Sequence, residues 1–85
     1  MYEWDERKRQ LNLAKHGVDF AAMESFEWDS ASNSMDHSHV EPRWTAIGYI
    51  DQRLYTLVNA EREDFVRIIS LRKATPQEQR HYAEA

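Results

Sequence analysis

Residues 5–20 read DERKRQLNLAKHGVDF and carry the signals for a helix, its end and the start of a second helix. Asp5 can cap a helix over residues 6–16, because its carboxylate can accept hydrogen bonds from the unpaired N–H groups of the first turn. Gly17 tolerates the left-handed backbone conformation that commonly ends a helix. The segment therefore predicts a first helix that ends at Gly17.

A second, short helix is predicted over residues 20–26. Asp19 can cap it, and Val18 and Met23 occupy the two positions of a hydrophobic staple. Two capped helices separated by a glycine are typical of a helical hairpin, including the hairpins of DNA-binding proteins. The N-terminal part of the chain is therefore expected to hold two helices.

The apolar residues of the first helix predict which side of it is buried. Trp4, Leu11 and Ala14 recur at helical spacing, so we expect this side to contact the core. Leu13 lies off that line, which indicates partial cover on a second side.

Three strand-like segments follow a polar loop over residues 28–42. They are rich in β-branched and aromatic residues and span residues 43–50, 53–60 and 65–73. Only short polar turns separate them, so we expect them to pair as an antiparallel meander. The polar loop has room for a short edge strand, and the chain is expected to start as a strand or an extended segment before Asp5.

A C-terminal helix is predicted over residues 76–83. Thr75 and Glu78 are spaced as a capping box, and Pro76 occupies the first helical position. The order of elements indicates an α+β domain, in which helices flank one face of an antiparallel sheet of three to four strands. The sequence shows no linker and no repeat, which predicts a single domain over residues 1–85.

The composition narrows the class of protein. The 85 residues include no Cys, which excludes disulfides and thiolate metal sites. No apolar run has the length of about 18 residues that a membrane span requires, and the N-terminus lacks the pattern of a signal peptide, so we expect a cytoplasmic protein with no membrane partner. The net charge is −4, but basic residues concentrate in residues 7–16 and 67–80. These two islands could hold a few phosphates if folding brings them together.

The basic islands and their surroundings hold the candidates for catalysis. Arg67 and Arg72 can each bind a phosphate through two hydrogen bonds. Lys15 and His16 can transfer protons, since His titrates near neutral pH, and Glu61 is a second candidate base. Cleavage of RNA without a metal ion requires such groups: a base for the 2′-hydroxyl, an acid for the leaving oxygen and cations for the charged transition state. At a helix end, Lys15 and His16 would also simply complement the helix dipole.

Three further residues are candidate contacts for RNA. Lys73 and Arg80 offer positive charge near Arg72, and Tyr82 could stack on a base. Tyr82 has an equally simple structural interpretation, in which it packs the final helix on the sheet. Arg72 lies near the end of its strand with no evident role in the core, so we expect Arg72→Ala to leave the fold intact.

The polar loop contains His37-Ser38-His39, with Asp36 and Glu41 nearby as possible oxygen ligands. Two His residues in a polar loop, without Cys and without a helical His pair, are weak evidence for a metal site. We therefore predict that His37 and His39 bind no structural metal and that the protein uses no cofactor.

Four segments of the chain resemble the BrnT-type toxins, the ribonuclease halves of type II toxin–antitoxin modules. The segments are Glu3-Trp4-Asp5; Asn12 to Phe20; Asp36-His37-Ser38 with Glu41-Pro42-Arg43 and Ile47-Gly48; and Arg67 to Thr75 with Glu78 and Tyr82. The first, second and fourth are specific when taken together, in this order and in a chain of this length. The chain departs from the family at Gln52, where Gly is usual, and at Asn59-Ala60, where Tyr-Thr is common.

The resemblance implies a RelE-like ribonuclease fold, toxicity through RNA cleavage that inhibits translation, and neutralisation by a BrnA-like ribbon-helix-helix antitoxin. It also implies that the protein meets operator DNA only within the antitoxin complex. An alternative stays open, because the net charge is low for a toxin directed at RNA: a degenerate, non-catalytic member would use the same basic face to bind a protein. The enzyme interpretation requires His16 to face one cleft with Arg67 or Arg72.

Overall fold

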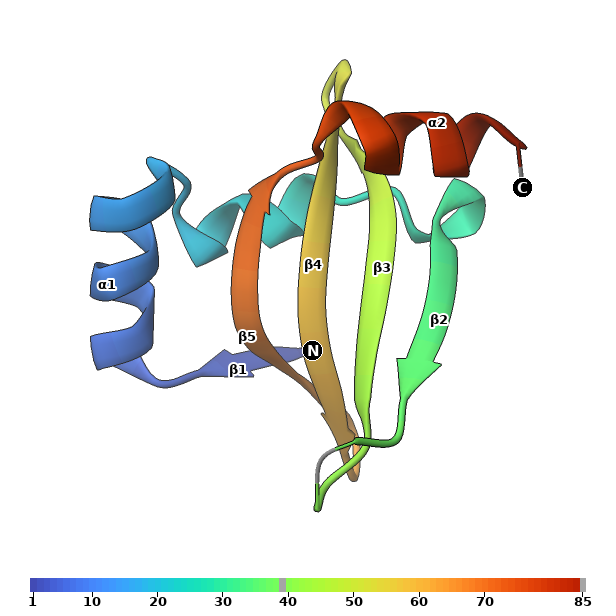
Figure 1. Cartoon of the computed structure of the whole chain (residues 1–85). Helices are drawn as coiled ribbons and strands as arrows, with labels where there is room; N and C mark the ends of the chain where they lie inside the picture. Colours follow the sequence, from blue (N-terminus) through green and yellow to red (C-terminus); the bar gives the residue numbers. More distant parts are fainter. Residues whose placement is uncertain (39, 85) are drawn as a thin grey trace.

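The computed structural model describes residues 1–38 and 40–84. Its elements are β1 (Tyr2–Trp4), α1 (Glu6–His16), the 3₁₀ segments η1 (Phe20–Ser25) and η2 (Trp28–Ser30), β2 (Ser32–Asp36), β3 (Arg43–Ile50), β4 (Arg53–Arg62), β5 (Phe65–Lys73) and α2 (Pro76–Glu84). Figure 1 shows the sheet at the centre, with α1 beside β5, the 3₁₀ segments behind the upper half of the strands and α2 across the front. The fold is α+β, as the sequence predicts.

Among the described residues, the sheet has five strands in the order β1-β5-β4-β3-β2. The predicted antiparallel meander of β3, β4 and β5 is confirmed, and β2 adds an antiparallel edge strand. The prediction of a wholly antiparallel sheet with three to four strands is wrong, because β1 pairs in parallel with β5. β1 has only three residues, and its position depends on a partner more than sixty residues away along the chain, which no local pattern reveals.

The prediction of a second N-terminal α-helix over residues 20–26 is also wrong. Asp19 caps the segment as expected, since its carboxylate accepts a hydrogen bond from the Ala21 N–H at 2.9 Å. The capped segment nevertheless forms only the 3₁₀ helix η1. Phe26 then becomes extended and pairs with Ile50 of β3. This pairing ends η1 after six residues, a length at which an α-helix gains few hydrogen bonds.

The other predicted helix ends are confirmed. Asp5 accepts a hydrogen bond from the Arg7 N–H at 2.8 Å, and Gly17 is left-handed with a φ of 70°. At the start of α2, the Glu78 N–H donates to Thr75 Oγ1 at 3.1 Å and the Thr75 N–H donates to the Glu78 carboxylate at 2.8 Å. The capping box is therefore complete.

The core lies between the sheet and η1. Its largest fully buried apolar side chains are Phe20 and Met23 of η1, Leu57 of β4, and Ile68 and Leu71 of β5. Alternate residues of the strands point to this core or away from it, so the second face of the sheet is left for α2 and for polar side chains.

The apolar side predicted for the first helix is not the side that faces the sheet. Leu11 is 62% exposed, whereas Asn12 is only 7% exposed. The Asn12 amide donates to the backbone oxygens of Leu71 at 2.7 Å and Val18 at 3.0 Å, and it accepts a hydrogen bond from the Leu71 N–H at 3.2 Å. Because β1 pairs with β5 only over residues 66–68, Asn12 takes the place of a neighbouring strand at Leu71.

Candidate functional site

The face of the sheet opposite the core carries a hollow of about 410 Å³, which we call the basic hollow. Its lining consists of Lys8, Val40, Glu41, Arg43, Arg62, Arg67 and Ile69. Helix α1 supplies the lysine, and the ends of β3, β4 and β5 that lie far from α2 supply the arginines. A chain with a net charge of −4 thus gathers four cations in one place.

Strand pairing explains why the arginines share a face. Asn59 lies opposite the buried core residue Ile68, and the next pair along the strands is Ala60 with Arg67. Because successive side chains alternate between the faces, Ala60 and Arg67 point away from the core, as does Arg62 two residues later. Arg62 and Arg67 therefore line the basic hollow from neighbouring strands.

Acidic residues partly offset the positive charge of the basic hollow. Arg67 Nη1 lies 3.5 Å from Glu3 Oε2, because Glu3 and Arg67 are paired where β1 runs beside β5. Glu41 contributes a second carboxylate to the lining. The Glu3–Arg67 pair is partly exposed and is therefore weak, so an incoming phosphate can compete for Arg67.

A second hollow of about 250 Å³ lies between α1 and β5, and we call it the helix groove. Its lining consists of Lys8, Leu11, Asn12, Lys15, His16, Ile69 and Ser70. Lys8 and Ile69 line both hollows, so the two adjoin each other. The structure thus places Lys15 and His16 in a hollow that adjoins the one holding Arg67. The described linings do not put His16 in one cleft with Arg67 or Arg72, which the enzyme interpretation required.

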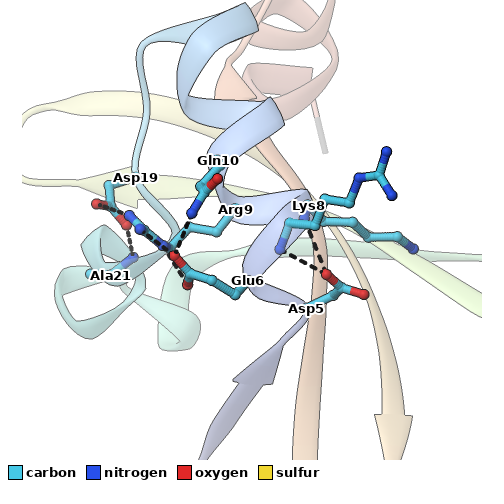
Figure 2. Close-up of polar contacts among 8 residues, drawn as sticks. Asp5, Glu6, Lys8, Arg9, Gln10, Asp19 and Ala21 are labelled. Atoms are coloured by element: carbon cyan, nitrogen blue, oxygen red, sulfur yellow. Dashed lines mark hydrogen bonds and ion pairs between the residues drawn. The ribbon is translucent and has the colours of Figure 1, made fainter.

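Lys8 and Arg9 point to different sides of α1 (Figure 2). Arg9 donates hydrogen bonds to Glu6 at 2.8 Å and to Asp19 at 2.9 Å, which ties α1 to the start of η1. The hydrogen bond from Arg9 lowers the pKa of Glu6 to about 2. Arg9 therefore has a structural role. Its neighbour Lys8 instead lines both the basic hollow and the helix groove.

Arg72 is held within the fold. Its guanidinium donates two hydrogen bonds to Glu78, at 2.7 and 2.8 Å, and Glu78 also accepts a hydrogen bond from Thr56 Oγ1 at 2.9 Å. The hydrogen bond from Arg72 lowers the pKa of Glu78 to about 2, and Glu78 in turn raises the pKa of Arg72. The expectation that Arg72 lacks a structural role is therefore wrong, because this pair joins β5 to α2. The described linings of the basic hollow and the helix groove do not include Arg72.

Glu61 lies on the other face of the sheet. It is opposite Val66, one position along from the pair of Ala60 and Arg67, so alternation points it to the core side. The two candidates Glu61 and Arg67 are thus separated by the thickness of the sheet.

The three candidate RNA contacts near the C-terminus lie around α2. Lys73 lines a separate hollow of about 460 Å³, and Arg80 is exposed on α2. Tyr82 packs edge-to-face on Tyr49 with ring centroids 5.7 Å apart, and its hydroxyl donates a hydrogen bond to the backbone oxygen of Ser30 at 2.9 Å. Through these contacts, Tyr82 packs α2 on the sheet, as its structural interpretation predicted.

Three cations of the basic hollow were not among the candidates drawn from the sequence: Lys8, Arg43 and Arg62. Arg62 was missed because the predicted strand ended at residue 60, whereas β4 continues to Arg62. Arg43 begins β3. It lies near Arg62 and Arg67 only because β3, β4 and β5 pair side by side, which the sequence near Arg43 does not reveal.

No three His, Cys, Asp or Glu side chains come close enough to hold a metal ion within residues 1–38 and 40–84. His39 lies outside the described residues, so the prediction for the pair of His37 and His39 stays a prediction. In the same described part of the chain, no helix is long and apolar enough to cross a membrane.

Comparison with protein families matches residues 4–78 to the family described as ribonuclease toxin, BrnT, of type II toxin–antitoxin system. No curated protein matches the chain. The matched segment includes both linings, the basic hollow and the helix groove. Because the match covers most of the 85 residues, the chain belongs to the BrnT family of ribonuclease toxins of type II toxin–antitoxin systems.

Proposed function

We propose that this protein is an active toxin with a RelE-like fold, which cleaves RNA internally and without a metal ion and so inhibits translation. The observation that carries this proposal is the junction of the basic hollow with the helix groove through Lys8 and Ile69. One hollow offers cations for phosphates, and the other offers His16 and Lys15 for proton transfer. RNA cleavage requires both kinds of group at the same phosphodiester.

The basic hollow would hold the RNA backbone. Arg43, Arg62 and Arg67 can each form paired hydrogen bonds to phosphate oxygens, and Lys8 adds a point charge between the hollows. Cations fixed at the scissile phosphate would stabilise the charge that grows on it in the transition state. In this proposal, Arg67 stays a catalytic candidate and exchanges its Glu3 partner for the phosphate.

The helix groove would supply the proton transfers. One of His16 and Lys15 takes the proton of the 2′-hydroxyl, whose oxygen forms a bond to the neighbouring phosphorus as the bond to the 5′-oxygen breaks. The other gives a proton to that 5′-oxygen. The products would be a 2′,3′-cyclic phosphate and a 5′-hydroxyl, so no water and no metal ion enters the cleavage step.

The remaining candidates take lesser parts in this proposal. Arg72 would hold α2 on the sheet through Glu78 and act on RNA only indirectly. Lys73 and Arg80 would contact flanking RNA near α2. Glu61 is left out, because it lies on the opposite face from Arg67.

The family match implies an antitoxin protein as partner. We propose that this antitoxin is BrnA-like, with a ribbon-helix-helix fold, and that operator DNA is bound only through the complex of the two proteins. The protein would act in the cytoplasm, where it meets its RNA substrate.

A non-catalytic role as a protein-binding module is the second candidate. The observation that favours it is the partial neutralisation of the basic hollow, where Glu3 lies 3.5 Å from Arg67 and Glu41 stands in the lining. In that role, the cations would serve only to bind an acidic segment of the antitoxin.

Expression of the chain without an antitoxin distinguishes the two candidates. The enzyme should arrest growth and degrade cellular RNA, and Arg67→Ala should relieve both effects. Arg7→Ala is the matched control, because Arg7 is exposed on α1 and is not part of either described lining. Normal growth and intact RNA with folded wild-type protein would reject the enzyme and favour the binding module.

A further inference from the structure

The core-facing side of the sheet carries a hollow that the proposed RNA-cleaving site does not use. It has a volume of about 390 Å³, and we call it the aromatic hollow. Its lining consists of Trp28, Asn33, Trp44, Asn59, Glu61 and Val66. Trp28 comes from the 3₁₀ segment η2, which lies behind the strands (Figure 1), and the other lining residues come from β2, β3, β4 and β5.

Strand pairing places the polar groups of the aromatic hollow on the same face as its tryptophans. Trp44 lies opposite Asn59, and Glu61 lies opposite Val66. Asn59 and Glu61 are two residues apart on β4 and so share a face. A carboxylate, an amide and an indole ring are therefore neighbours on the sheet surface.

Trp28 and Asn59 are held in place before any ligand arrives. Trp28 Nε1 donates a hydrogen bond to the Tyr2 hydroxyl at 2.5 Å, and the Trp28 ring packs edge-to-face on Phe26 with centroids 4.8 Å apart. Asn59 is buried and lies within 3.5 Å of the Trp44 backbone oxygen. Side chains held in this way lose little conformational freedom when a ligand binds.

The lining of the aromatic hollow carries a negative charge. Glu61 is the charged residue of the described lining. Along the chain, Glu27 and Asp29 flank Trp28. Glu61 is followed by Arg62, which lines the basic hollow, and then by Glu63 and Asp64. The basic hollow, with its four cations, lies on the opposite face of the sheet. This arrangement favours a cationic ligand and opposes a polyanion such as RNA.

We propose that the aromatic hollow binds an arginine side chain of a protein partner. A guanidinium can stack on a tryptophan ring, where it gains a cation–π attraction. In the same plane, it can donate two parallel hydrogen bonds to the Glu61 carboxylate, and the Asn33 side-chain oxygen offers a further acceptor. Lysine has a single compact charge and cannot stack and form paired hydrogen bonds at once, which is why arginine fits this lining better.

This site is independent of the RNA-cleaving site, because the two lie on opposite faces of the sheet. A partner that inserts an arginine here leaves the basic hollow open to RNA. The aromatic hollow could therefore be occupied whether or not the protein cleaves RNA.

Titration with N-acetyl-arginine amide tests the proposal on the intact chain. The indole N–H signals of ¹⁵N-labelled protein report the tryptophans separately. We expect the signals of Trp28 and Trp44 to shift, while the signal of Trp4, which packs on Phe20, stays in place. N-acetyl-lysine amide should bind about fivefold more weakly, because it lacks the planar donor pair. These comparisons use wild-type protein and do not depend on the folding of a variant.

Glu61→Gln should weaken the binding of N-acetyl-arginine amide by about tenfold. Glu63→Gln is the matched control, since it removes the same charge two residues away and lies outside the described lining; it should change the affinity by less than about twofold. Unmoved Trp28 and Trp44 signals, equal affinities for the arginine and lysine amides, or equal effects of the two variants would overturn the proposal. Tighter binding of guanosine monophosphate at the same signals would also overturn it, in favour of a nucleotide site.

Discussion

Asn12 fixes the position of α1 against the sheet. Its side chain satisfies both backbone groups of Leu71 and the backbone oxygen of Val18, all in a buried setting. We expect Asn12→Ala to lower the free energy of unfolding by about 2–4 kcal/mol, because it leaves buried polar groups without partners. Urea unfolding measures this loss.

Leu11→Ala is the control on the same helix. Leu11 is largely exposed, so its replacement should change the free energy of unfolding by no more than about 0.5 kcal/mol. If the two variants lose the same stability, Asn12 does not have the bridging role described above.

The pair of Arg72 and Glu78 predicts how stability depends on acid. The folded-state pKa of Glu78 is about 2, against an ordinary value of 4.5, so between these values the unfolded chain binds more protons than the folded one. The stability contributed by Glu78 is therefore present above pH 4.5 and is lost as the pH falls towards 2. We expect Glu78→Gln to be less stable at neutral pH and to lose less stability over that acid range.

Urea unfolding at several pH values checks this prediction. Glu6 also has a pKa of about 2, so Glu78→Gln should reduce the acid dependence without removing it. Gln79→Ala is the control: it removes a hydrogen bond from α2 to the Ala74 backbone oxygen at 3.2 Å but no titrating group. It should lower stability equally at each pH. If the free energy of unfolding of Glu78→Gln fell with pH as steeply as that of the wild-type protein, the proposed effect of the pair would be ruled out.

The structural role of Arg72 changes how its replacement must be interpreted. Arg72→Ala leaves the Glu78 carboxylate without its main partner and loosens α2. Relief of toxicity in this variant would therefore not identify Arg72 as catalytic unless its unfolding curve matched that of the wild-type protein.

At the scale of elements, β3 depends on a glycine for space. A Cβ atom at Gly48 would lie 2.6 Å from Phe26 Cζ and 3.1 Å from Ala31 Cβ. We expect Gly48→Ala to cost about 1–3 kcal/mol of stability by overpacking, although glycine by itself weakens a strand. Thermal unfolding measures this cost.

Phe26→Leu tests whether the clash with the Phe26 ring causes the loss of stability in Gly48→Ala. The smaller side chain makes room for the new methyl group, so adding Gly48→Ala to Phe26→Leu should cost less than adding it to the wild-type protein. An equal cost in both backgrounds would show that the clash with the Phe26 ring is not the cause.

The elements that could be predicted are those with signals confined to a few residues. The caps at Asp5 and Gly17 and the capping box of Thr75 and Glu78 depend only on neighbouring residues, and all are as predicted. The same kind of signal failed for residues 20–26, because pairing of Phe26 with β3 outweighed the local preference for a helix. β1 could not be predicted as a paired strand, because three residues carry too little pattern.

At the scale of the whole molecule, the candidate site could be predicted only in part. The N-terminal basic island and Arg67 do come together, but an alternation pattern read straight through β5 would place Arg67 on the same face as the core residue Leu71. The register shift between Val58 and Asn59 reverses the faces along β5. Such a shift has no signature in the sequence, and it explains why Arg67 faces the basic hollow.

The central proposal is that the basic hollow and the helix groove form one RNA-cleaving site. Single-turnover cleavage of one RNA by purified protein, with RNA affinity measured in parallel, separates binding from chemistry. His16→Ala should lower the rate constant of cleavage by about 10²–10⁴-fold, as the loss of a general acid or base does, with little change in RNA affinity and a much smaller effect on antitoxin binding. Arg67→Ala should weaken RNA binding as well as cleavage, and the control Arg7→Ala should behave as the wild-type protein.

This comparison is decisive for His16 when both proteins have the same unfolding curve. The proposed site predicts a loss in the chemical step itself. An unchanged cleavage rate in folded His16→Ala would remove His16 from the mechanism and contradict the proposal that the helix groove supplies the proton transfers.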